Sequence, residues 1–399
     1  MLTSLAFIFL VGLSMAAICQ RFKLPRIIGM LITGIVLGPY VLDLLDPSIL
    51  SISTELRQMA LIIILLKAGL SLNLDDLKKV GRPAIMMSCV PASCEILAFF
   101  LLAPSILGVN RIEAAVMGSV LGAVSPAVVV PRMIQLMDAK YGTDKSIPQL
   151  IMAGASCDDI FVIVLFSTFV SMAQGGHANL LDFINIPVSI VLGIILGAVT
   201  GYLLSLFFET AYAHKHCVRN SMKVIVVLGI SFLLMAIETW LKGIVSVSGL
   251  LAVVSMACTL KIKSIAFVSK RLSEKFGKLW LAAEVLLFVL VGAAVDIRYT
   301  LNAGIAAVLM IILALIFRSA GVAICLVGTP MTWRERVFCM IAYLPKATVQ
   351  AAIGSVPLAM GLPCGQIVLS VAVLAILITA PLGAIGTDLT YKYLLKKEE

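Results

Sequence analysis

Long apolar segments separated by short polar connections run from the first residues of the chain to the last. A helix needs about 20 consecutive apolar residues to cross the hydrocarbon core of a bilayer. The pattern therefore predicts an all-α polytopic membrane protein with 13 transmembrane helices. The predicted spans are residues 2–19, 25–43, 56–73, 83–106, 112–137, 147–173, 185–209, 221–240, 243–260, 278–297, 301–327, 334–360 and 363–388.

Prolines interrupt two of these predicted spans well away from their ends. Pro126 lies near the centre of residues 112–137, and Pro345 lies within residues 334–360. A proline in a helix removes one backbone donor and clashes with the preceding turn. We therefore expect both helices to be broken inside the membrane.

Each interrupted span is the middle member of a group of three. The groups cover residues 83–173 and 301–388. They begin with the fourth and the eleventh predicted spans, which are seven spans apart, and successive spans cross the membrane in alternating directions. Corresponding helices of the two groups therefore run in opposite directions. Inverted repeats with two broken helices that cross at the midplane are typical of secondary transporters, which bind ions at the crossing.

Composition narrows the class of protein further. Of the 399 residues, 61% are hydrophobic and 13% are charged, and the mean hydropathy is +1.12. These values exclude a soluble globular protein. The nine cysteines are scattered, with no close C-x-x-C pair, which predicts free thiols without a disulfide framework or a zinc site. We expect no resident cofactor.

The net charge of +9 is concentrated on one side of the predicted membrane. If the N-terminus lies outside, 23 of the 30 lysine and arginine residues fall in connections on the cytoplasmic side. The outside connections contain only Arg111, Lys242 and Arg298. This distribution predicts an outside N-terminus and a cytoplasmic C-terminus. It also assigns the basic excess to the cytoplasmic rim of a membrane protein, so membrane lipids are expected as partners and nucleic acid is not.

Two adjacent carboxylates, Asp158 and Asp159, lie near the middle of the predicted span 147–173. A single carboxylate at the bilayer centre costs at least about 2.5–3.5 kcal/mol on insertion scales. Two neighbouring carboxylates cost more, because like charges resist joint ionisation. We therefore expect a water-filled pocket inside the helix bundle, where the two aspartates bind protons or cations.

The other ionisable residues at membrane depth fall in the same two groups of spans. These residues are Glu95, Arg318 and Lys346, whereas Lys67 and Glu284 also lie in apolar runs, where a structural role is open to either. Adjacent helix positions point about 100° apart, so one aspartate can line an ion path while the other reaches a base. Hydroxyl and carboxylate oxygens are hard donors that suit a small cation such as sodium. The candidate neutral ligands are Ser125, Ser156 and Thr348.

Three other functions remain open at this point. An intramembrane aspartyl protease also uses two membrane aspartates, but its carboxylates converge from separate helices, which adjacent aspartates on one helix do not easily do. A potassium–proton exchanger needs the same broken helices and carboxylates. A sodium-coupled symporter of an organic anion needs exposed helix N-termini and a roomy polar cavity.

Two runs of sequence resemble a known family. The runs Gly122–Pro131 and Ala155–Ile160, the second of which contains both aspartates, are similar to the monovalent cation–proton antiporter superfamily and in particular to its NHA-type sodium–proton exchangers. The resemblance covers nearly the whole chain. It implies a six-helix core that moves as an elevator against a dimerisation domain, and hence a homodimer. The chain lacks the long N-terminal extension of some animal members, which favours a bacterial protein of the inner cell membrane.

The resemblance also implies roles for the charged residues. Asp159 is then the principal carboxylate for protons and for sodium or lithium, and Asp158 contributes to the same site. Glu95 is associated with Arg318, and Lys346 offsets the dipoles of the broken helix ends. An arginine does not release its proton in proteins, so Arg318 is a fixed charge and not a proton carrier.

The expected function is therefore sodium(lithium)/proton antiport by elevator-type alternating access, with no enzymatic activity. Because Glu95 can satisfy the fixed charge of Arg318, we expect one-for-one electroneutral exchange. The expected segments are N-terminal spans, mainly of the dimerisation domain (1–82), the first half of the core with the ion site (83–173), a linker helix and dimerisation spans (174–300), the second half of the core (301–388) and a cytoplasmic tail (389–399).

Overall fold

The computed structural model describes residues 1–22, 24–71, 81–174, 180–213, 220–241 and 247–398. These residues form helices almost throughout, as expected. In chain order the helices are α1 (Leu2–Arg21), α2 (Arg26–Leu37), α3 (Pro47–Ser51), α4 (Ser53–Ser71), α6 (Arg82–Met87), α7 (Val90–Leu107), α8 (Arg111–Leu121), α9 (Pro126–Asp138), α10 (Ile147–Gln174), α11 (Leu180–Ala213), α12 (Asn220–Trp240), α13 (Gly249–Lys263), α14 (Ala266–Ala293), α15 (Ile297–Cys325), α16 (Trp333–Ala342), α17 (Thr348–Gly354), α18 (Val356–Ala359) and α19 (Gly365–Leu394).

Nine segments in the described part of the chain are long and apolar enough to cross a membrane. Two shorter apolar helical segments, Arg26–Leu37 and Thr348–Ala359, accompany them. A polytopic helical membrane protein is therefore confirmed, whereas the number of 13 transmembrane helices stays a prediction.

The chain divides into two compact units. Unit 1 comprises Met1–Thr54, Asn73–Phe169 and Val285–Glu399, and unit 2 comprises Glu55–Leu72 and Val170–Glu284. Every residue that the sequence nominates for the ion site belongs to unit 1. The assignment of segments to a core and a dimerisation domain stays a prediction.

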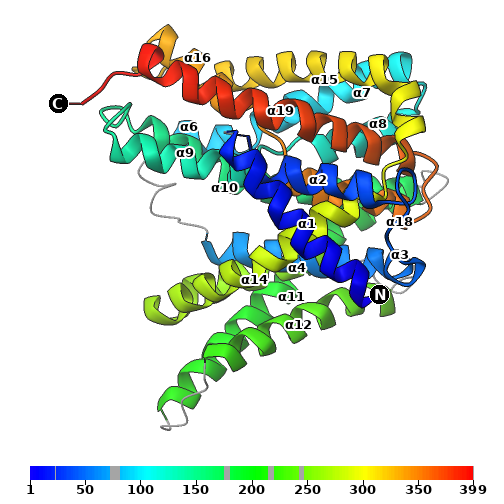
Figure 1. Ribbon diagram of the computed structural model, residues 1–399. Helices are drawn as coiled ribbons and strands as arrows, with labels where there is room; N and C mark the ends of the chain where they lie inside the picture. The colour runs from blue at the N-terminus through cyan, green and yellow to red at the C-terminus, as the bar shows by residue number, and fades with distance from the viewer. Residues whose placement is uncertain (23, 72–80, 175–179, 214–219, 242–246, 399) are drawn as a thin grey trace. The chain divides into compact units, whose positions relative to one another are not determined.

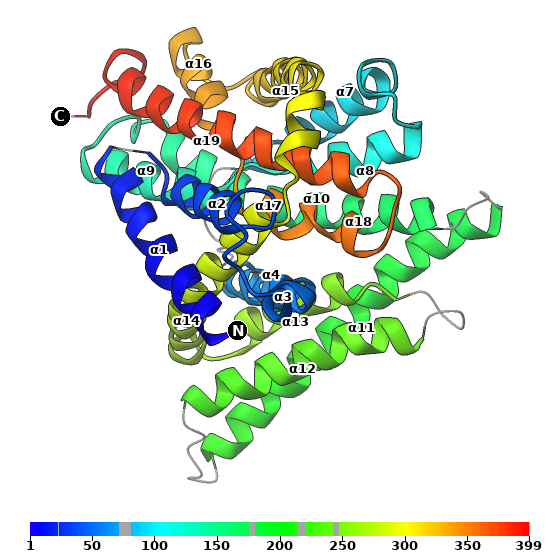
Figure 2. The ribbon, with the colours of Figure 1, turned by 45° about the vertical axis from the view of Figure 1, so that its right-hand side comes forward.

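Unit 1 contains two regions with the same order of elements, a helix, an interrupted helix and a second long helix. We call residues 90–169 (α7 to α10 as far as Phe169, beyond which α10 belongs to unit 2) the acidic region and residues 297–394 (α15 to α19) the basic region, after their buried charges. The regions pack against each other: α7 lies alongside α15, and α19 contacts α8, α9 and α15 (Figures 1 and 2).

Both predicted interruptions are present. Helix α8 ends at Leu121 before α9 begins at Pro126, and α16 ends at Ala342 before α17 begins at Thr348. Pro126 is the first residue of α9, and Pro345 lies in the turn between α16 and α17, so at neither position does the missing N–H remove a helical hydrogen bond. The prediction of two broken helices is therefore confirmed.

Each interrupted helix begins with the same device. Asn110 accepts from the backbone N–H of Glu113, whose side chain in turn accepts from the N–H of Asn110. Thr332 and Glu335 form the equivalent capping box at the start of α16. A capping box satisfies backbone donors that a helix start leaves free. Polar side chains thus fix where both interrupted helices begin.

The sequence did not predict a third interruption. The span expected over residues 83–106 is divided into α6 and α7, with the change at Ser88 and Cys89. Pro91 explains the position, because proline lacks an N–H and disfavours helical geometry in the residue before it. The helix that carries Glu95 therefore starts at this bend.

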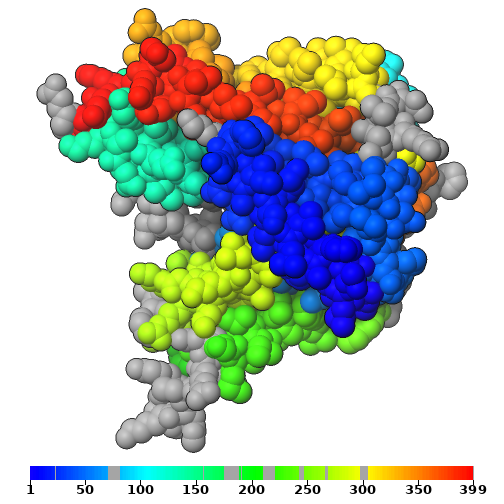
Figure 3. Space-filling view, in the orientation of Figure 1, coloured from blue at the N-terminus to red at the C-terminus, as the bar shows by residue number. Residues whose placement is uncertain are grey.

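The end of the chain is held against the connection between α9 and α10. Tyr141 and Lys397 form an isolated antiparallel bridge. The N–H of Gly142 donates to the carbonyl of Lys396 (2.8 Å), and the N–H of Glu398 donates to that of Lys140 (2.8 Å). Figure 3 shows the red C-terminal end next to the green-cyan segment that carries this connection. Most of segment 389–399, expected as a tail, continues α19 or lies in this contact.

Unit 2 contains a close contact between α11 and α13. A Cβ atom built on Gly193 lies 2.6 Å from the carbonyl oxygen of Ser248, and one on Gly201 lies 2.5 Å from that of Met256. A Cβ atom built on Gly197 would lie closer still to the carbonyl oxygen of Ala252. Only glycine permits this approach, which is typical of small residues spaced by four in membrane helices.

Candidate ion-binding site

The two interruptions in unit 1 meet. The backbone N–H of Ser125 donates to the carbonyl of Pro345 (2.7 Å), and the hydroxyl oxygens of Ser125 and Thr348 are 3.4 Å apart. All three residues are in the non-helical turns or at the helix start beside them. The crossing brings together four helix ends, whose backbone carbonyl and N–H groups lack intrahelical partners.

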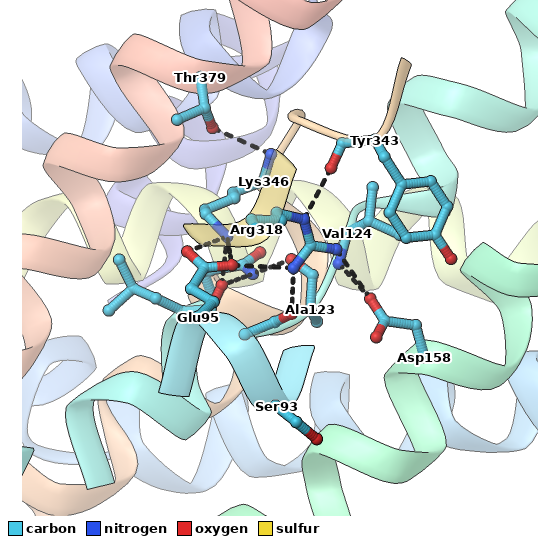
Figure 4. Close-up of polar contacts among 12 residues, drawn as sticks. Ser93, Glu95, Ala123, Val124, Asp158, Arg318, Tyr343, Lys346 and Thr379 are labelled. Carbon is cyan, nitrogen blue, oxygen red and sulfur yellow. Dashed lines mark hydrogen bonds and ion pairs between the residues drawn. The ribbon is translucent and has the colours of Figure 1, made fainter. Parts of the chain in front are cut away.

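Arg318 on α15 occupies the centre of this crossing and is fully buried (Figure 4). Its guanidinium donates to Glu95 (2.8 Å) and to Asp158 (3.1 Å). It also donates to the carbonyl of Gly122, after α8, and to that of Tyr343, after α16. One permanent cation therefore stabilises the negative ends of both interrupted helices and two carboxylates.

Lys346, in the second interruption, supplies a second buried cation at the crossing. Its ammonium group contacts both carboxylate oxygens of Glu95 at 2.7 Å and donates to the carbonyl of Leu121. Its backbone N–H donates to the hydroxyl of Thr379 on α19 (3.0 Å). Glu95 therefore lies between two bases, and α8 ends against both of them.

The two aspartates of α10 have different environments. Oδ2 of Asp158 accepts from Arg318 and from the backbone N–H of Val124 (2.7 Å). Asp159 is 6% exposed, and no residue that the structure describes donates to its buried Oδ1. The 100° offset between neighbouring helix positions explains why only one of the two reaches the arginine. Asp159 therefore keeps a carboxylate oxygen available to an incoming ion.

A charge count makes the same distinction. Arg318 and Lys346 balance Glu95 and Asp158, all four of which are completely buried. Asp159 is the carboxylate left without a base in this cluster. A buried, unbalanced carboxylate is costly unless a proton or a cation neutralises it. The cluster therefore needs one more positive charge to be neutral when all three carboxylates are ionised.

The structure describes the side chains of two of the three candidate neutral ligands. Ser125 and Thr348 are buried at the crossing, and the N–H of Thr348 is 3.5 Å from the hydroxyl of Ser125. The side chain of Ser156 lies outside the described residues. The participation of these three hydroxyls in ion binding stays a prediction.

Sequence reasoning missed several groups at the crossing. Gln350 donates to the carbonyl of Ala123 (2.7 Å), and Tyr343 provides the carbonyl that binds Arg318. Gln350 and Thr379 are polar residues in apolar runs, which is a usable but weak signal. The backbone carbonyls that receive the cations carry no signature in the sequence at all.

Comparison with known proteins identifies the family. The model of the transmembrane sodium/hydrogen exchanger family matches residues 5–391. The chain belongs to the sodium/hydrogen exchanger family. The resemblance seen in the two sequence runs is therefore confirmed, and membership indicates a transporter of the cation/proton exchange class.

Curated relatives and solved structures agree with this family. Sodium/hydrogen exchanger 9B2 of Homo sapiens is 34% identical over 394 residues, which cover 94% of this chain and 71% of that protein. Sodium/hydrogen exchanger 9B1 of Homo sapiens is 32% identical, with coverage of 91% and 71%. The sodium proton antiporter MjNhaP1 from Methanocaldococcus jannaschii matches with a TM-score of 0.83, 20% identity and 98% coverage of both chains. At that identity the structural match supports the fold.

Proposed function

We propose that this protein exchanges sodium or lithium for protons across the membrane by alternating access, with Asp159 as the carboxylate that changes its occupant. The observation that carries the proposal is the difference between the two aspartates. Oδ1 has no donor among the described residues in either aspartate, but Oδ2 of Asp158 is held by Arg318 and Val124, whereas no base in the described part of the chain forms an ion pair with Asp159. A proton and a monovalent cation then compete for one negative charge.

Competition at Asp159 explains coupling. A bare carboxylate crosses the low-dielectric barrier only at a large desolvation cost, whereas a protonated or cation-bound one crosses neutral. Because the other four charges of the cluster balance, each crossing carries either one proton or one cation. We therefore propose one-for-one electroneutral exchange.

The contacts between the two interruptions favour an elevator-type movement. Arg318 joins both helix ends, and the N–H of Ser125 is bonded to Pro345. Separating these elements would expose buried ion pairs, which is strongly unfavourable. We propose that the acidic and basic regions move together as one body and carry the ion with them.

The geometry favours this function over an anion symporter. Both buried cations at the crossing already contact carboxylates, since Lys346 binds Glu95 and Arg318 binds Glu95 and Asp158. A symported carboxylate would need one of these bases to exchange partners. Sodium and potassium carry the same charge and differ in ionic size, so the same carboxylate suits a potassium–proton exchanger. Both cations are therefore tested.

The test is proton flux in sealed liposomes that contain an internal pH dye. Sodium, lithium or potassium is added outside, and the wild type is compared with Asp159→Asn and Asp158→Asn. We expect a sodium- and lithium-dependent alkalinisation of the liposome interior, because protons leave as the cation enters, and we expect Asp159→Asn to abolish it. Asp388→Asn is the matched control, because Asp388 pairs with Arg132 at a half-exposed position outside the cluster.

Each other outcome changes a specific part of the proposal. A response to potassium alone makes the protein a potassium–proton exchanger, and full activity of Asp159→Asn moves the site elsewhere. Clamping the membrane potential with potassium and valinomycin tests stoichiometry. A rate that follows the imposed potential contradicts electroneutral exchange.

We further propose a homodimer in the inner cell membrane, with an outside N-terminus, a cytoplasmic C-terminus and lipids against its apolar surface. The uneven distribution of lysine and arginine supports the orientation. Large exposed apolar side chains on α11, such as Val199 and Phe207, suit contact with lipid or a second copy. The mass of the purified protein in detergent tests the dimer.

A further inference from the structure

A single peptide group at the first interruption lies between the two regions. The N–H of Val124 donates to Oδ2 of Asp158 (2.7 Å), and the carbonyl of Ala123, in the same peptide, accepts from the side-chain amide of Gln350 (2.7 Å). The C=O and N–H of a planar trans peptide point in opposite directions. The orientation of this carbonyl therefore fixes the direction in which the N–H points at Asp158.

Gln350 is itself held firmly. It is fully buried, and its Oε1 accepts from the backbone N–H of Ala347 at the start of α17 (2.8 Å). Its Nε2 also lies 3.4 Å from the carbonyl of Leu121, which receives the ammonium of Lys346. The amide thus joins the peptide that follows Lys346 to the peptide that binds Asp158.

We propose that Gln350 is a positioning residue for the ion site, which acts through the Ala123–Val124 peptide to hold Asp158 with its Oδ1 free. The proposal rests on cation/proton exchange at Asp158 and Asp159. No donor in the described part of the chain reaches Oδ1 of Asp158. The hydrogen bonds to Oδ2 therefore determine the position of Oδ1. Gln350 touches neither aspartate.

The chemistry of an amide suits this task. Ala347 requires an acceptor and Ala123 requires a donor, and a glutamine side chain offers both without adding charge. Successive hydrogen bonds in a buried chain also polarise one another. A charged residue at this position would disturb the balance of the cluster, and an apolar residue would leave both backbone groups without partners.

Two substitutions separate positioning from general stability. Gln350→Met keeps the length of the side chain and removes both hydrogen bonds. Gln350→Glu retains a donor and an acceptor while it is protonated but only acceptors once it is ionised. Gln366→Met is the matched control, because Gln366 is half-buried at the start of α19 and its Oε1 has no partner among the described residues.

The measurements are sodium-dependent proton flux in liposomes from pH 6 to 9 and the sodium-induced shift in melting temperature in detergent. We expect Gln350→Met to raise the apparent KM for sodium about tenfold, the lower end of what loss of a supporting hydrogen bond costs at metal sites. The maximal rate falls by less, and the sodium-induced shift shrinks. For Gln350→Glu the KM relative to wild type rises with pH, whereas for Gln350→Met that ratio is constant.

Specific results overturn the positioning role. A KM for Gln350→Met within twofold of wild type, or an equal change in Gln366→Met, contradicts it. A lower melting temperature with unchanged KM and pH profile shows a structural role instead. If Gln350→Met does not fold, Gln350→Glu decides the matter through the same pH-dependent ratio. Absence of sodium-dependent flux in the wild type overturns the proposed function itself.

Discussion

The acidic region and the basic region of unit 1 solve the same backbone problem with opposite charges. Each has a helix interrupted beside a proline, and each interrupted helix begins with a capping box. The acidic region brings Glu95, Asp158 and Asp159, whereas the basic region brings Arg318 and Lys346. The backbone plan is shared because any broken helix must start and stop cleanly, but the chemistry is divided.

This division shows what each region contributes. The long helix that ends the acidic region carries the aspartates, whereas its counterpart α19 places Thr379 near the crossing. The basic region compensates charge and satisfies helix ends, and the acidic region keeps the one carboxylate that remains unbalanced. The cluster contains three carboxylates from the acidic region and two bases from the basic region. This excess of one carboxylate allows it to take up a cation or a proton.

The largest expected effect comes from removing the cation that serves both regions. Arg318→Met should lower the free energy of unfolding by about 3–5 kcal/mol, because it removes one of the two cations that balance the buried carboxylates and takes a donor from Glu95, Asp158 and two carbonyls. Chemical denaturation in detergent micelles measures the change. Arg132→Met is the control, since Arg132 pairs with the half-exposed Asp388 and should cost far less. Equal losses in both variants would show that the two regions do not depend on the buried arginine.

An exchange of charge between the regions should have an intermediate effect. In Glu95→Lys with Lys346→Glu the total charge is conserved, but the new glutamate faces the carbonyl of Leu121, which accepts from Lys346 in the wild type. We expect this pair to be less stable than Glu95→Met with Lys346→Met, by about 1–3 kcal/mol for the unsatisfied groups. Greater stability of the exchanged pair would mean that only the charge count matters and not which region holds each sign.

The smallest expected effect concerns the shared capping boxes. Glu113→Ala should cost about 1 kcal/mol, the usual value for a lost cap. Glu335→Ala should cost more, because Glu335 is buried and also binds Lys145 at 2.8 Å. Melting temperatures of the two variants in detergent test the order. A larger loss in Glu113→Ala would contradict the view that the basic region depends more on its cap.

Much of this arrangement could be predicted from sequence, because its causes are local. Pro126 and Pro345 lie at the two interruptions and mark them through a missing donor, which is a local signal, although Pro104, Pro131 and Pro381 lie inside helices. The cost of a charge in the membrane likewise marks Asp158 and Asp159 without any knowledge of the fold. The bend before Pro91 obeys the same rule but was missed, since that proline lies near the expected start of a span.

The pairing of Asp158 rather than Asp159 with Arg318 could not be predicted in the same way. Helical geometry indicates that Asp158 and Asp159 diverge, but not which of them reaches Arg318. That choice depends on the packing of α7, α10 and α15, which no local pattern records. Gln350 was missed because a neutral amide costs little in an apolar run, and the carbonyls at the helix ends look alike in any sequence.

The glycines of α11 have a mechanical consequence of their own. Gly193, Gly197 and Gly201 each seat one carbonyl of α13, and the seats repeat every fourth residue, about 6 Å along the helix axis. If α13 slid along α11 by less than this repeat, its carbonyls would meet positions of α11 that have larger side chains. Helices α11 and α13 can therefore pack only in discrete registers, and their contact resists gradual sliding of one helix along the other. We expect α11 and α13 to act as a single strut whose register does not change while ions are carried.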